Sequence, residues 1–103
     1  MQSSLQVEVE RCESHSVIRL QGELNVACAA ELKGVLVATM AEGGDLQVDL
    51  EGAVAIDVSI MQLLWATRDE AKRMGTDFAV RASEAVGLAS RDAGFDLFLG
   101  EPV

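Results

Sequence analysis

The alternation of apolar and polar residues over residues 45 to 51 constrains the fold of this chain most. The stretch reads DLQVDLE, so Leu, Val and Leu fall on one side of an extended chain while Gln, Asp and Glu fall on the other. Successive side chains of a strand point to opposite faces of its sheet, so this strand has one apolar face and one wet face. Strands covered by helices on both faces are instead apolar throughout. We therefore expect helices mainly on one face.

The same period of two occurs elsewhere in the chain. Residues 5–11 and 17–22 flank the polar stretch CESHS, which predicts an antiparallel hairpin with His15 as a solvated residue at its tip. Residues 76–83, TDFAVRAS, predict a later strand. Residues 95–100, FDLFLG, predict a weak last strand or an irregular tail.

Helical spacing separates these strands. Apolar residues follow Asn25, a good helix cap, at intervals of three and four up to Met40, and Gly43-Gly44 ends that helix. A second helix is predicted over about 59–74, ended by Gly75, and a short third one within 84–94. The order predicts an α/β fold with a single mixed sheet of four to five strands. The first two strands form the hairpin, the later ones run parallel, and the helices lie mainly on one face.

Size and charge narrow the functional classes. The chain has 103 residues, half of them hydrophobic, which suits one domain over 1–103 with a real core. Its net charge of −9 disfavours nucleic acid and anionic lipid surfaces as partners. No signal peptide or membrane-length apolar run is present, so we expect a cytoplasmic protein with no direct membrane insertion. Two cysteines and one histidine do not match a zinc site, and we expect reduced thiols and no metal or cofactor.

Several stretches taken together resemble a STAS domain, the fold of bacterial anti-sigma-factor antagonists and of the cytoplasmic domains of sulfate transporters. They are VIRLQGELN, LQVDLEGAVAID, the glycine that closes the second helix before TDFAV, and EAVGLASRDAGFDLF. The resemblance covers nearly the whole chain. It implies a STAS-like sheet and a regulatory role in signal transduction through protein–protein interaction.

The resemblance also implies a switch, at which this sequence departs from the family. Antagonists of the phosphorylated type carry Asp-Ser-Ser-Gly or Asp-Ser-Thr-Gly after the third strand, and the hydroxyl directly after the Asp accepts phosphate. This chain reads Asp57-Val58-Ser59-Ile60. Val58 cannot be phosphorylated, and Ile60 lacks the conformational freedom of glycine. The departure therefore falls on the residues that carry the switch.

Two interpretations of the loop remain open. Ser59 is either a displaced phosphoacceptor or simply the cap of the following helix, since Ser suits either position. Asp57 is likewise either functional or a carboxylate stabilised by the dipole at a helix N-terminus.

The second helix carries one unusual residue. On a helical wheel its apolar side includes Ile60, while Met61 lies at the border and Trp65 nearly opposite the apolar centre. In the STAS family this helix and the preceding loop dock the partner. We therefore predict that Ile60, Met61 and Trp65 border a partner-binding patch. The alternative is that Trp65 packs on a neighbouring loop or side-chain stem.

The leading functional hypothesis is a non-enzymatic anti-sigma-factor antagonist acting through loop 53–59 and the helix after it. Its partner would be an anti-sigma factor that is also a serine kinase, or a signalling complex, with a role in transcription regulation. The alternative is a STAS subunit of a lipid-transporting ABC system or a chemotaxis-associated component. Both leave the partner and the oligomeric state open.

An enzyme or a phosphoaccepting receiver domain is the third class considered. A receiver needs clustered acids after its first strand and a Lys after its fifth, and VEVERC and the final strand lack them. No nucleophile–base pair and no glycine-rich phosphate loop is visible in the sequence. We expect no enzymatic activity.

Overall fold

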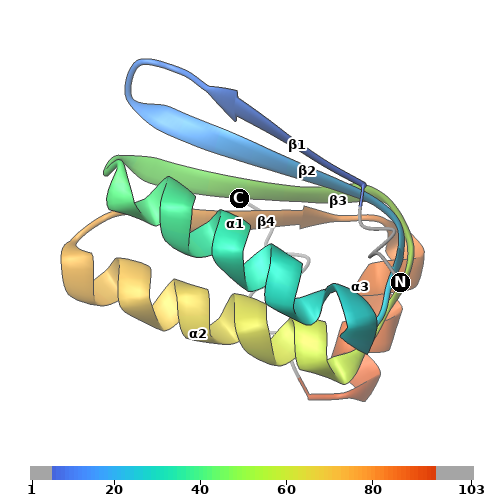
Figure 1. Cartoon of the computed structure of the whole chain (residues 1–103). Coiled ribbons are helices and arrows are strands. Elements are labelled where there is room, and N and C mark those ends of the chain that lie inside the picture. The colour runs from blue at the N-terminus through green and yellow to red at the C-terminus, as the bar shows by residue number, and fades with distance from the viewer. Residues whose placement is uncertain (1–5, 95–103) are drawn as a thin grey trace.

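The sheet is mixed, as the sequence predicts. The computed structural model describes residues 6–94, which form four strands in the spatial order β1-β2-β3-β4 (Figure 1). Strand β1 (Gln6–Arg11) pairs antiparallel with β2 (His15–Leu24), and β3 (Asp45–Ile56) and β4 (Phe78–Ala82) continue the sheet in parallel. The predicted last strand at 95–100 lies outside the described residues.

The helices cover one face. A short 3-10 helix η1 (Val26–Cys28) leads into α1 (Ala29–Ala41), followed by α2 (Val58–Met74) and α3 (Glu84–Asp92). Helices α1 and α2 lie side by side beneath the sheet, while α3 lies toward the end at which α2 begins (Figure 1). All three contribute to one core, which confirms the one-sided arrangement. Its buried members include Ile18, Leu20, Leu32, Leu36, Val48, Leu50, Ile60, Leu64, Val80 and Val86.

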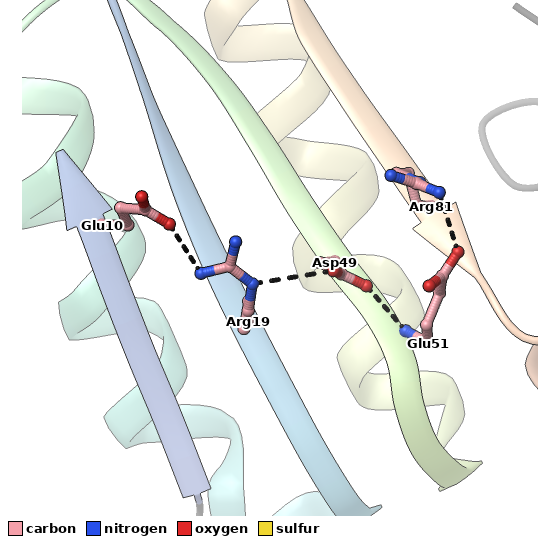
Figure 2. Close-up of polar contacts among 5 residues, drawn as sticks. All are labelled: Glu10, Arg19, Asp49, Glu51 and Arg81. Carbon is pink, nitrogen blue, oxygen red and sulfur yellow. Dashed lines mark hydrogen bonds and ion pairs between the residues drawn. The ribbon is translucent and has the colours of Figure 1, made fainter. Parts of the chain in front are cut away.

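The other face of the sheet is polar. Arg19 lies between Glu10, 2.8 Å away, and Asp49, 3.9 Å away, and Arg81 reaches Glu51 at 3.1 Å (Figure 2). These pairs are solvent-exposed and contribute little to stability individually. They keep this face compatible with water, which is what the alternation in β3 predicts.

The helix ends follow their capping residues. The side chain of Asn25 accepts a hydrogen bond from the backbone N–H of Ala27 and so caps η1, after which α1 begins. Gly75 ends α2 in the left-handed conformation with φ of 76°. This conformation favours glycine because it has no Cβ.

One predicted turn residue belongs to a strand. His15 is half-buried and is the first residue of β2, and its carbonyl accepts a hydrogen bond from Cys12 N–H at 2.8 Å. The turn is therefore shorter than CESHS suggests, because this bond closes the hairpin before His15. The assignment of His15 to a solvated tip was wrong.

A bulge changes the faces of β3 near its end. The register with β2 passes from Arg19–Asp49 to Gln21–Gly52, so β3 contains one extra residue there. A Cβ on Gly52 would lie 3.0 Å from the side chain of Gln21, which explains the small residue at this crossing. If the alternation continued from Leu50 without interruption, Ala53 would be exposed and Val54 would be buried. Instead, Ala53 is buried and Val54 is exposed. A second register shift, from Gly22–Ala53 to Glu23–Ala55, makes Val54 an extra residue of β3, so these two irregularities expose a valine near the end of the strand.

Candidate functional site

The candidate site lies where β2 and β3 end together. The two strands are parallel, so their carboxyl ends meet at one edge, with Leu24 opposite Ile56. The backbone N–H of Asp57 donates to the carbonyl of Leu24 at 2.8 Å and extends this pairing by one step. Helix α2 begins at the next residue. The prediction of a loop over 53–59 is therefore corrected: residues 53–56 belong to β3, 58–59 belong to α2, and only Asp57 lies between the two elements. We keep the name loop 53–59 for this segment.

Asp57 is the N-cap of α2. Its backbone is extended, with φ −84° and ψ 156°, and its Oδ2 accepts hydrogen bonds from the backbone N–H of Ser59 at 2.8 Å and from the Ser59 hydroxyl at 2.7 Å. The Ser59 hydroxyl, and then its N–H, lower the pKa of Asp57 because they stabilise the charged carboxylate. Asp57 is exposed and ionised at neutral pH, so a negative charge marks the helix entry.

Ser59 does not cap the helix. It lies inside the first turn, half-buried, and its hydroxyl donates to the carboxylate of Asp57. The capping interpretation of Ser59 is therefore corrected, because the cap position belongs to Asp57 and α2 begins one residue earlier than predicted. Ser59 is nevertheless the one hydroxyl within loop 53–59.

Three exposed valines lie on the segments that meet at this end of the sheet, and we call Val26, Val54 and Val58 the loop-end patch. Their side chains are 66%, 69% and 45% exposed. Val26 opens η1 just after β2, Val54 follows the bulge of β3, and Val58 is the first residue of α2. Val54 lies within the predicted loop 53–59, whereas Val26 was not assigned to the site. Gly52 could have indicated that Val54 is exposed, because a glycine within a strand often marks a bulge.

Two of the predicted patch residues are interior. Ile60 is 0% exposed and Met61 is 2% exposed, so neither side chain reaches the surface. The wheel placed Met61 at the border, and this placement was wrong. Helix α2 contacts α1, η1 and β4, and these contacts bury a wider arc than its apolar stripe alone. Ile60 and Met61 thus support the loop from beneath.

Trp65 is half-buried and packs against the core. The guanidinium of Arg68 lies 5.7 Å from the centre of its ring, within cation–π range. The placement of Trp65 opposite the apolar side is therefore corrected, and the packing alternative fits better. Trp65 retains a partly exposed surface beside the loop-bearing end of α2.

The chemistry available at this end is that of a binding surface. It offers one carboxylate, one hydroxyl hydrogen-bonded to it, and apolar side chains. Within residues 6–94, no three His, Cys, Asp or Glu side chains are placed to hold a metal ion. No helix in that part of the chain is both long and apolar enough to cross a membrane. Cys12 and Cys28 are both free thiols.

Known proteins with a similar sequence or structure share this architecture. A family model described as "Mlab, STAS domain" matches residues 7–91. Comparison with curated protein sequences gives no match. Among solved structures, an anti-sigma factor antagonist from Mycobacterium paratuberculosis superposes with a TM-score of 0.79 at 25% identity, over 94% of this chain and 84% of that one.

Two further structures are similar in fold. The anti-sigma factor antagonist SpoIIAA in its unphosphorylated form has a TM-score of 0.76 at 17% identity, over 93% of this chain and 85% of that one. A variant of RsbS from Moorella thermoacetica has a TM-score of 0.73 at 18% identity, over 89% and 80% of the two chains. At these identities the likeness concerns the fold alone.

Proposed function

Because this chain belongs to the STAS domain family, we propose that it is a non-catalytic regulatory domain of the anti-sigma-factor-antagonist type. It binds a protein partner through loop 53–59 and the first turn of α2. The match over residues 7–91 and the likeness to antagonist structures support the general class. The docking residues and the regulation are our inference from the geometry of this chain.

The loop-end patch is the observation that carries the proposal. A small protein in water gains nothing by exposing three valines at one end of its sheet, since apolar surface favours burial. Here the three valines lie close in sequence to the paired strand ends Leu24 and Ile56, which Asp57 with its ionised carboxylate follows directly. Apolar contact area beside a fixed charge is suited to a partner with an apolar surface and a neighbouring cation or hydrogen-bond donor.

In this domain, docking does not depend on a phosphorylation switch at the residue after Asp57. Val58 has no hydroxyl, and its exposed side chain adds apolar area to the surface in place of a modifiable group. The Ser59 hydroxyl is half-buried and donates to Asp57, so it is poorly placed to attack a phosphoryl donor. A phosphate on Ser59 would also place a dianion against the Asp57 carboxylate. Ser59 stays the candidate acceptor should the loop be modified.

The partner in this proposal is an anti-sigma factor, a serine kinase, or a signalling assembly in the cytoplasm. A second candidate places the same domain in a lipid-transporting ABC system or beside chemotaxis machinery. The observation that favours this candidate is that the matching family model is described as Mlab and not as an antagonist. Both candidates use the same docking end and differ in the protein bound.

Affinity capture with matched variants tests the proposal. The immobilised chain is incubated with a cytoplasmic extract of its source, and captured proteins are identified by mass spectrometry. Val54→Glu adds a charge to the loop-end patch and should abolish capture of the specific partner. Val37→Glu, at a valine of α1 that is also largely exposed, should leave capture intact. Equal capture by wild type and Val54→Glu would overturn the docking site. An anti-sigma factor supports the first candidate and a transporter ATPase subunit the second.

A further inference from the structure

Helix α1 carries more apolar surface than the fold covers. Its sequence is AAELKGVLVATMA, in which Glu31 and Lys33 are the only charged residues. A helix that is apolar on all sides is normally buried on all sides. Here only Leu32, Leu36 and Thr39 are buried. The outward side of α1 is therefore an apolar surface without cover among the described residues.

The uncovered side has the shape of a helix-packing face. Ala30, Gly34, Ala38 and Ala41 are exposed and recur at intervals of three and four, so they line one side of α1. Val37 projects beside them and is 59% exposed. Small residues at this spacing allow another helix to approach closely. The stripe alone does not identify a partner.

A groove adjoins this stripe. It lies between α1 and α2 and has a volume of about 450 Å³. Val37, Met40 and Ala41 form one wall, and Leu63, Ala66 and Met74 form the other. Met74 is 48% exposed, although the helical wheel assigns it to the apolar side. We call the stripe and the groove together the helix-layer face.

The charges of the molecule are distributed unevenly around this face. Helix α1 carries one acidic and one basic residue, and α2 carries two acidic and three basic ones, so together they have a net charge of +1. The whole chain has −9, which leaves −10 for the remainder. The polar side of the sheet belongs to that remainder, and there Glu10, Asp49 and Glu51 pair with Arg19 and Arg81 (Figure 2). Two copies repel each other least when their helix layers meet.

We propose that the helix-layer face binds a second copy of this chain in a two-fold symmetric dimer. Lys33 lies at the α1 wall of the groove, and Glu70 lies at the α2 wall, where it also pairs with Arg73 of its own helix. In a two-fold interface each contact occurs twice, so Lys33 of each copy can meet Glu70 of the other. The apolar stripes and grooves cover one another, and the polar sheet faces point away from the interface.

The size of the face makes this dimer weak. Helix α1 has 13 residues and is thus about 20 Å long, and packed helices lie about 10 Å apart. The two-helix face then covers roughly 400 Å² per copy, about half of the ~800 Å² in a standard interface. Repulsion between two chains of charge −9 lowers the affinity further. The dimer therefore forms at high concentration or where copies are held together by another assembly.

Analytical ultracentrifugation tests the dimer. Sedimentation velocity on the full chain from about 10 μM to about 1 mM should show a concentration-dependent approach to dimer mass. Val37→Glu should remain monomeric over the same range, whereas Val54→Glu at the loop-end patch should behave as wild type. Circular dichroism confirms that both variants fold. A monomer at every concentration, or association that survives Val37→Glu, would overturn the proposal.

A charge swap provides the sharper test. Lys33→Glu alone should weaken association roughly fivefold, because two ion pairs become two repulsions. Lys33→Glu combined with Glu70→Lys should restore the wild-type dissociation constant, since a symmetric interface regains both pairs. A double variant that associates no better than Lys33→Glu would refute the two-fold arrangement. Capture of the loop-end partner should be unaffected throughout, so the two proposals fail independently.

Discussion

The loop-end patch and the helix-layer face both expose valines, but for different reasons. At the loop end, exposure comes from irregular backbone: two register shifts of β3 against β2 expose Val54, and the cap at Asp57 places Val58 in the first turn of α2. On the helix layer, α1 is regular, and exposure comes from its composition. Backbone irregularity therefore positions one surface, while residue choice creates the other.

The charges of the two surfaces also differ. The loop-end patch lies on the segments that meet at Asp57, whose ionised carboxylate suits a partner that supplies a complementary group. The helix-layer face has nearly balanced charges and suits a surface like itself. One small domain can thus use two separate surfaces for two kinds of partner.

The largest effect is expected from Ile60→Ala. Ile60 is fully buried beneath the loop end, so the free energy of unfolding should fall by about 2–4 kcal/mol, through lost burial and an internal cavity. Urea unfolding followed by circular dichroism measures it. Val58→Ala, at an exposed neighbour, serves as the control and should change stability by less than about 0.5 kcal/mol. A stable Ile60→Ala variant that loses its partner would instead restore the predicted binding role of Ile60.

A smaller loss is expected for Trp65→Ala. Trp65 packs on the core but is half-exposed, so the change should destabilise the fold by roughly 1–3 kcal/mol. Thermal unfolding measures this loss. Gln62→Ala, at an exposed position of the same helix, is the control that separates loss of packing from a general effect on α2. A loss below about 0.5 kcal/mol, as at ordinary surface sites, would return Trp65 to the role of a docking residue.

The charge on Asp57 should make a pH-dependent contribution. Its pKa is lower in the folded chain than in the unfolded one, because the Ser59 hydroxyl and N–H stabilise the carboxylate. The contribution is therefore fully present above the ordinary Asp pKa of about 3.9 and is lost as pH falls through the folded pKa. Asp57→Asn keeps a capping side chain without charge, so wild type and variant should differ in Tm at pH 7 and converge in acid.

The control for this experiment is Asp69→Asn, at an exposed position in the interior of α2. It removes the same charge without touching the helix entry and should not reproduce the convergence. A difference between wild type and Asp57→Asn that is constant with pH would show that the carboxylate does not stabilise the helix entry through its charge.

The smallest structural effect is expected from Val58→Ser, which restores the hydroxyl that the family places after the Asp. The site is exposed, so stability should change by less than about 0.5 kcal/mol. With ATP and the kinase identified by capture, peptide mapping should find phosphate on the introduced serine and none on wild-type loop 53–59. Phosphorylation of the wild-type chain on Ser59 would establish Ser59 as a displaced acceptor and end the claim that docking here lacks a switch.

The sequence was sufficient where a local pattern has one physical solution. The alternation over 45–51 required one wet face, and the polar ladder of Figure 2 occupies it. Asn25 begins a helix through a hydrogen bond to a residue close to it in the sequence, and Gly75 ends one through its own backbone conformation. Their roles could therefore be predicted from the sequence. The position of Asp57 at the helix entry was likewise visible, although the sequence offered the cap role for Ser59 and not for Asp57.

Only the tertiary structure decided which side chains are buried by elements that are distant in the sequence. A helical wheel orders side chains around one axis but does not say how many elements surround it, so Met61 and Trp65 were placed too far toward solvent. The exposure of Val54 depends on register shifts between two strands far apart in sequence. Within residues 6–94, the exposed side of α1 results from α2 packing against one flank of α1 and leaving the other open. In each case the burial of a side chain depends on neighbouring elements that cannot be identified from residue spacing.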